Sequence, residues 1–100
     1  MADAKIRVRY FGLIRNVVGR QDDEVPADGL MTVRQVLEAL VERHGEGFRD
    51  AVLAGGGLLR PTALVFLNGK DIAKLGGIDV LLDRDDEVSV AVVTHALGGG

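Results

Sequence analysis

The 100-residue chain contains no cysteine, and it has only two prolines and four aromatic residues. Without cysteine it cannot carry a disulfide framework, a thiolate metal site or a cysteine nucleophile. With so few aromatic side chains, the hydrophobic core must be built mainly from valine, leucine, isoleucine and alanine. The absences therefore exclude disulfide-stabilised scaffolds and thiol-dependent catalysis.

The sequence also lacks long apolar runs and a strong charge bias. No apolar stretch approaches the ~18 residues that a membrane span requires. The first five residues do not have the basic-then-apolar layout of a signal peptide, so we expect a cytoplasmic protein. The formal net charge is -3 with no long basic run, which argues against a nucleic-acid-binding surface. With 47% hydrophobic and 27% charged residues, the composition is typical of one globular domain with a modest core.

Alternation of apolar and polar residues predicts the strands. Ile6, Val8 and Tyr10 would face a core while Arg7 and Arg9 face outward, which is the period of a half-buried strand. Further strands are predicted over residues 24–27, 70–72 and 87–93, and the continuous apolar run 63–67 is interpreted as a buried strand. The first of these contains a proline and so suits only an edge position. An Asn-Gly pair at 68–69 predicts a tight two-residue turn.

A helix is the clearest element. Thr32 and Gln35 form a Thr-x-x-Gln capping box, in which each side chain satisfies a free backbone group of the first turn. Gly45 can end the helix in a left-handed conformation. The apolar stripe consists of Val33, Val36, Leu37, Leu40 and Val41. We expect a connection over residues 13–19 and little regular structure over residues 46–60. The order of elements predicts an α+β fold, with a mixed sheet of about five strands and one main helix packed on one face.

The carboxyl terminus ends in glycine. His95-Ala96-Leu97-Gly98-Gly99-Gly100 follows the last predicted strand and would reach roughly 20 Å if extended. A glycine tail has no side chains to obstruct it, so it can enter a narrow channel and deliver its carboxylate to another protein's active site. The alternative is a frayed end without function, as is common at termini.

Several segments, in this order along the chain, resemble one known family. They are Val8-Arg9-Tyr10-Phe11-Gly12, Thr32-Val33-Arg34-Gln35-Val36-Leu37, Val65-Phe66-Leu67-Asn68-Gly69-Lys70, Leu82-Asp83-Arg84-Asp85-Asp86-Glu87-Val88 and the Gly-Gly end. Together they resemble the MoaD/ThiS family of ubiquitin-like sulfur carrier proteins, of the molybdopterin synthase small-subunit type. The resemblance implies a β-grasp domain over residues 1–94 and a flexible glycine tail over residues 95–100.

The resemblance also implies a function. A ubiquitin-activating-type adenylyltransferase of the MoeB/ThiF type would use ATP to adenylate the terminal glycine carboxylate. A sulfur donor would then displace AMP and leave a thiocarboxylate. That sulfur would pass to a synthase subunit of the MoaE type, with molybdopterin synthesis as the leading pathway. The chain itself would be a carrier and not an enzyme, with no bound cofactor and no metal.

The tail supplies most of the candidate site residues. Family members usually end in two glycines, whereas this chain ends in three. Either Gly100 carries the activated carboxylate, or Gly100 is removed and Gly99 carries it. We expect Gly98, Leu97 and His95 to contact the partner, and the last two replace the prolines that the family commonly has there.

One candidate lies outside the tail. In a strand whose even-numbered residues face the core, Phe11 faces the other side of the sheet. It can therefore belong to an apolar patch that docks the activating enzyme.

Other groupings favour plain structural interpretations. Asp83, Asp85, Asp86 and Glu87 lack the spacing of a calcium loop and are typical of a turn. Gly55-Gly56-Gly57 lacks the Lys-Ser/Thr of a phosphate loop, and we interpret it as a mobile loop. His44 and His95 are far apart with no third ligand, and there is no recognisable catalytic triad.

Two other functions remain open at this point. The chain could be a ubiquitin-like modifier, conjugated to lysines through its terminal glycine. It could also be a β-grasp interaction module that never uses its tail. Deleting residues 98–100 would leave the function of such a module intact.

Overall fold

Five strands form one mixed sheet in the computed structural model, which describes residues 5–27 and 29–93. The strand order is β2 (Asp22–Pro26), β1 (Lys5–Gly12), β7 (Glu87–Val92), β4 (Ala63–Leu67) and β5 (Lys70–Asp71). The central strands β1 and β7 are parallel, and every other neighbouring pair in this sheet is antiparallel. Two short strands, β3 (Met31–Thr32) and β6 (Leu81–Leu82), form a separate ribbon. The predicted mixed sheet and its proline-containing edge strand are therefore confirmed.

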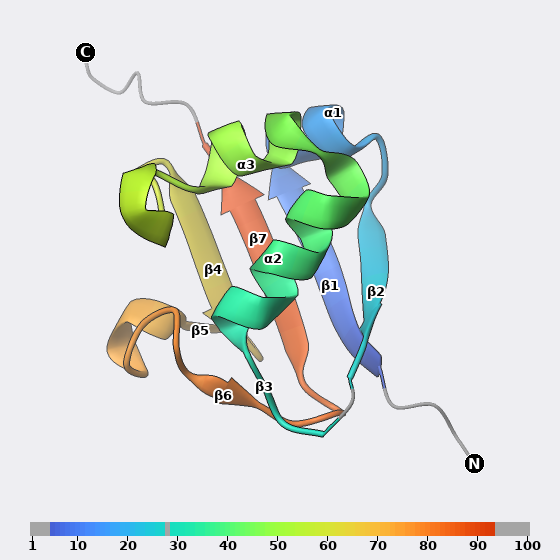
Figure 1. Ribbon diagram of the computed structural model, residues 1–100, viewed down its shortest axis with the longest axis vertical. Helices are drawn as coiled ribbons and strands as arrows, with labels where there is room; N and C mark the ends of the chain where they lie inside the picture. Colours follow the sequence, from blue (N-terminus) through green and yellow to red (C-terminus); the bar gives the residue numbers. More distant parts are fainter. Residues whose placement is uncertain (1–4, 28, 94–100) are drawn as a thin grey trace.

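One helix, α2 (Val33–His44), crosses one face of the sheet (Figure 1). Its predicted capping box is present: Gln35 N–H donates to Thr32 Oγ1 at 3.1 Å, and Thr32 N–H donates to Gln35 Oε1 at 2.8 Å. The predicted apolar stripe is buried along its whole length. At the other end Gly45 has φ 86° and ψ -162°, so its φ is positive but the residue is not in the left-handed helical conformation that the sequence suggested.

Two short helices occur in segments for which no helix was predicted. The expected connection at 13–19 contains α1 (Ile14–Val18), and the segment at 46–60 begins with α3 (Glu46–Val52). Each buries only one or two side chains, Ile14 in α1 and Phe48 and Val52 in α3. One or two buried anchors do not produce a periodic apolar pattern, so no helix could be predicted there. Residues 72–74 form a single 3₁₀ turn. At 55–57 a hydrogen bond from Gly57 N–H to the carbonyl of Ala54 at 3.2 Å closes one turn, but Gly56 and Gly57 have positive φ, 80° and 79°, so the three glycines form a loop turn and not a helix.

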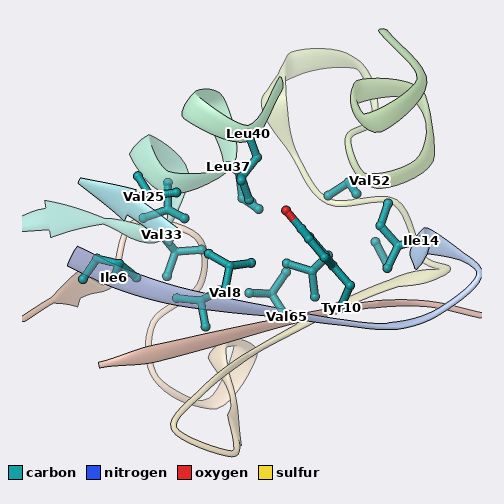
Figure 2. Packing of buried hydrophobic residues seen from close by; sticks show 14 of the residues in the cluster. Ile6, Val8, Tyr10, Ile14, Val25, Val33, Leu37, Leu40, Val52 and Val65 are labelled. Carbon is teal, nitrogen blue, oxygen red and sulfur yellow. The ribbon is translucent and has the colours of Figure 1, made fainter. Parts of the chain in front are cut away.

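The core lies between α2 and the sheet. Alternate residues of β1 and β7 face it, and their side chains are less than a tenth exposed. They are Ile6, Val8, Tyr10, Val88, Val90 and Val92. Figure 2 shows the three residues of β1 in this packing. At the far end of β4, Asn68 and Gly69 both have positive φ, 50° and 86°, as the predicted two-residue turn requires. No helix among the described residues is both long enough and apolar enough to cross a bilayer.

The ends of the two central strands meet at a glycine. Gly12 has φ 72°, and a Cβ placed on it would lie 2.5 Å from the carbonyl oxygen of Val92. The same carbonyl accepts a hydrogen bond from Leu13 N–H at 2.9 Å. The close approach fixes the end of β7 against the turn into α1, at the point where the tail leaves the sheet.

We expect Gly12→Ala to destabilise the protein by about 2 kcal/mol or more, because it adds a clash with backbone to the strain of a positive φ. Gly19→Ala is the matched control, since Gly19 also has a positive φ, 74°, but its Cβ would meet nothing within 4 Å. That control should cost only roughly 1 kcal/mol. Urea unfolding of both variants measures the difference. Equal losses would contradict the importance of the contact with Val92.

Candidate functional site

The described chain ends next to the middle strand of the sheet. β7, the last strand, has β1 on one side and β4 on the other. Beyond its end, Val93 N–H still donates to the carbonyl of Thr62 at 3.0 Å. The predicted tail residues lie outside the described residues: His95, Leu97, Gly98, Gly99 and Gly100. The described residues end at Val93, immediately before the tail. The predicted roles of the tail residues therefore stay predictions.

An apolar patch adjoins this exit on the open face of the sheet. Strand register places Phe11, Ala91 and Leu64 in one row across β1, β7 and β4. Phe66 lies on the same face, two residues after Leu64 along β4. Val93 lies two residues after Ala91 and so belongs to the same face. Phe11 is 40% exposed and Leu64 is 36% exposed. We call these five residues the exit patch. The expectation that Phe11 lies on the face opposite the core is confirmed.

Two guanidinium groups flank the aromatic ring of this patch. The guanidinium carbon of Arg9 lies 5.7 Å from the Phe11 ring centre, and that of Arg15 lies 5.9 Å away. Arg15 is held by a hydrogen bond from its Nε to the carbonyl of Tyr10 at 3.0 Å, and Arg9 lies 3.5 Å from Glu87. Cation–π contacts of this kind hold the ring in place and give the patch a positive rim. Such a surface suits a protein partner with an apolar centre.

Leu64 is a surface residue that was not predicted as one. The continuous apolar run 63–67 was interpreted as a buried strand, yet Leu64 faces outward and Phe66 is only half-buried. Since helices cover only one face of this sheet, an apolar run without alternation leaves apolar side chains on the open face. The missing alternation was therefore the signal that could have located the patch.

A second cluster of functional groups lies on the core side. Asp23 of β2 is only 3% exposed. Its Oδ2 accepts a hydrogen bond from the Tyr10 hydroxyl at 2.8 Å and lies 2.7 Å from His44 Nε2. Its Oδ1 accepts from Arg43 at 2.8 Å and lies 3.4 Å from Arg20. Figure 2 shows the Tyr10 hydroxyl on the helix side of the sheet.

The pKa shifts fit a structural role for this cluster. Burial raises the pKa of Asp23, but hydrogen bonds from His44, Tyr10 and Arg43 outweigh it and hold that pKa below its usual range. Burial and the bond to Asp23 raise the pKa of Tyr10, so the phenol stays protonated and donates. Because an ionised carboxylate only accepts, His44 Nε2 must carry a hydrogen. These hydrogen bonds tie the end of α2 to β2, and among the described residues no serine or threonine hydroxyl belongs to the cluster.

The remaining candidates are structural where the chain is described. Asp86 accepts a hydrogen bond from Asp83 N–H at 2.8 Å and one from Asn68 at 3.0 Å, so the acidic segment is a turn. No group of three metal-ligating side chains occurs within residues 5–27 and 29–93. His44 belongs to the Asp23 cluster.

Comparison with known proteins gives sequence matches over most of the chain. The sequence profile of the ThiS family matches residues 8–99. The small archaeal modifier protein 3 of Haloferax volcanii is 31% identical over 86 residues, which are 86% of this chain and 91% of that protein.

Solved structures match the fold. The solution structure of the Haloferax volcanii HVO 2177 protein has a TM-score of 0.76 at 28% identity and covers 99% of this chain and 92% of its own. A Pyrococcus furiosus protein provisionally named molybdopterin converting factor, subunit 1 has a TM-score of 0.72 at 25% identity, over 91% of this chain and 99% of its own. The predicted ubiquitin-like β-grasp fold is confirmed.

The Asp23 cluster generates a pH prediction. Because the folded-state pKa of Asp23 is lowered, its ionised form stabilises the native state above the unfolded pKa of about 4, and this contribution is lost as pH falls through the folded value. Asp23→Asn should therefore lower the free energy of unfolding at pH 7 by about 3 kcal/mol. It should also flatten the loss of stability as pH falls below about 4, by up to about 1.4 kcal/mol per pH unit.

Urea unfolding across this pH range measures both effects. Tyr10→Phe is the control, since it removes one hydrogen bond, worth about 1 kcal/mol, and keeps the carboxylate. An Asp23→Asn variant with an unchanged pH slope would contradict the assignment.

Proposed function

Because the chain belongs to the ThiS family, whose members are small ubiquitin-like carrier proteins that act with partner enzymes, we propose that it is a sulfur carrier. Its functional group is the carboxylate of the terminal glycine. One observation carries the proposal: a sequence ending in three glycines follows the central strand β7 beside an exposed apolar patch. The patch would dock a partner while the tail enters the partner's active site.

The chemistry follows from the weak reactivity of a carboxylate. A free carboxylate is a poor acyl donor, so a partner of the MoeB/ThiF type first converts it to an acyl adenylate with ATP. Hydrosulfide, the sulfide-level sulfur released by a donor, then attacks the carbonyl carbon, AMP leaves with the bonding electron pair, a base takes the sulfur's proton, and a thiocarboxylate remains. The thiocarboxylate passes its sulfur to a synthase subunit of the MoaE type. The likeness to the Pyrococcus furiosus protein named as a molybdopterin converting factor subunit supports molybdopterin as the product.

The tail residues divide this work. Gly100, or Gly99 after removal of Gly100, carries the activated carboxylate. Gly98 keeps the entering segment free of side chains. Leu97 and His95 contact the partner near the mouth of its channel, beside the exit patch.

A second function has support of its own. The relative of 31% identity is named a small archaeal modifier protein. In a modifier the same acyl adenylate is attacked by a lysine amine of another protein, which forms an isopeptide bond. Both functions begin with the same activation, so they differ only in the nucleophile that receives the acyl group.

The first test is intact mass. After incubation with ATP, an adenylating partner from the same genome and a sulfur donor, the protein should gain the mass of one oxygen replaced by sulfur. The variant lacking residues 98–100 should gain nothing. Loss of one glycine before activation would identify Gly99 as the working end. An unchanged mass beside a partner active on another carrier would overturn the proposal.

The modifier alternative predicts a different product. Affinity-tagged protein recovered from its cells should then carry conjugates of higher mass, which disappear with residues 98–100. Isopeptide-linked peptides with no thiocarboxylate form would favour the modifier over the carrier.

The exit patch predicts a docking hot spot. Phe11→Ala should weaken binding to the adenylating partner by about tenfold or more, because exposed aromatic side chains often dominate interfaces. Leu81→Ala is the matched control, since Leu81 is 58% exposed on β6, away from the patch. Calorimetry of both variants measures the effect. If the control weakened binding as much as Phe11→Ala, the exit patch would not be the docking surface.

A further inference from the structure

The positive side chains of this protein are of two chemical kinds, and among the described residues only arginines lie near the exit of the tail. Nine of the twelve are arginines and three are lysines, and the distinction matters for an activated acyl group. The lysines are Lys5, Lys70 and Lys74.

All three lysines are exposed, and they lie away from the exit of the tail. Lys70 pairs with Leu67, which lies opposite Val88, four residues before Val92 on β7. Four residues of strand span about 13 Å. Lys5 begins β1, whose other end pairs with Val92, about 23 Å away at the same rise per residue. Figure 1 shows the start of β1, β5 and the turn that follows β5 at the opposite end of the sheet from the last residues of β7.

Arginines occupy the exit end instead. Arg15 lies over Phe11 in the turn of helix that follows Gly12. Arg60 lies two residues before Thr62, whose carbonyl binds Val93 N–H. Its Nε donates to the carbonyl of Asp50. Both side chains are exposed.

Arginine and lysine supply the same charge but different reactivity. A guanidinium stays protonated, with a pKa above about 12, and cannot attack a carbonyl carbon. A lysine amine has an ordinary pKa of about 10.4, so a small neutral fraction is available as a nucleophile near neutral pH. A lysine at the exit would therefore compete for the acyl group.

We infer that Arg15 and Arg60 are specificity-determining residues, which keep the exit end positively charged for docking and prevent the activated carboxylate from acylating its own domain. The inference rests on the proposed function, because only an activated tail needs this protection. The step avoided is attack of an amine nitrogen on the tail's carbonyl carbon. A C–N bond would form, the bond to AMP would break, AMP would leave with the electron pair, and a buffer base would take the amine proton.

The length of the tail makes the position of the amines important. Seven residues, from Thr94 to Gly100, can place the carboxylate at most about 23 Å from Val93. The positions of Arg15 and Arg60 lie well inside that reach. To reach Lys70, the tail would have to turn back along the sheet and use more than half of its extended length. To reach Lys5, it would have to use nearly all of that length. Intramolecular acylation depends on effective concentration, which falls steeply near full extension.

The test needs no partner enzyme, so its failure is distinct from failure of the proposed function. The full chain is prepared with a C-terminal thioester by intein cleavage and incubated dilute at mildly alkaline pH. Arg15→Lys and Arg60→Lys are compared with the wild type. Arg84→Lys is the matched control, since Arg84 lies in the turn before β7, at the far end of that strand. Equal urea midpoints show that all variants fold alike.

Cyclisation onto a lysine leaves a monomer one water lighter than the hydrolysed acid, and peptide mapping identifies the isopeptide bond. We expect Arg15→Lys and Arg60→Lys to form the lysine-linked ring roughly tenfold more than the wild type and Arg84→Lys. If all four proteins formed equal amounts, or if the wild type cyclised onto Lys70 or Lys74 as readily as the variants did, the inference would be overturned.

Discussion

The parallel pairing of the first and last strands is the constraint on which the structure depends. β1 and β7 can lie parallel only if the chain returns from the end of β1 to the other end of the sheet between them. The antiparallel strands β2 and β4 run in that return direction, and α2 runs over the core face in the direction of β1 (Figure 1). The pair ends where Gly12 approaches the carbonyl of Val92 too closely to permit a side chain. As a result, β7 ends in the middle of the sheet and not at one of its edges. The place where the tail begins is thus a consequence of the topology.

This arrangement suits a member of a family of small carrier proteins that act with partner enzymes. The polar cluster around Asp23 joins β2 to the end of α2 with its hydrogen bonds satisfied, so it stabilises the fold. The open face carries an exposed aromatic ring between two guanidinium groups, next to the exit. A carrier needs a reactive end, a surface that a partner can recognise and few competing nucleophiles nearby. In our account the tail, the exit patch and the arginines at the exit supply these three properties.

Much of the fold could be predicted from local patterns, because these patterns report local physics. The capping box at Thr32, the alternation in β1 and the Asn-Gly turn each depend on neighbouring residues, and each is present as predicted. Features that depend on distant residues were missed. The helix α3 is held by two buried anchors, and the Asp23 cluster joins residues from three separate elements. The candidate site was located by the resemblance to a family and by the parity of Phe11. Its extension to Leu64 required knowing that one face of the sheet is open.

The most direct test of the central claim, that the terminal carboxylate is the functional group, is the chemical state of that carboxylate in the cell. The protein should be purified from its own organism, treated at once with an electrophile that traps thiocarboxylates, and its C-terminal peptide identified by tandem mass spectrometry. We predict a trapped thiocarboxylate on the last glycine, Gly100 or Gly99. A C-terminal peptide found only as a free carboxylate, with no thiocarboxylate and no isopeptide-linked form under any growth condition, would contradict the account.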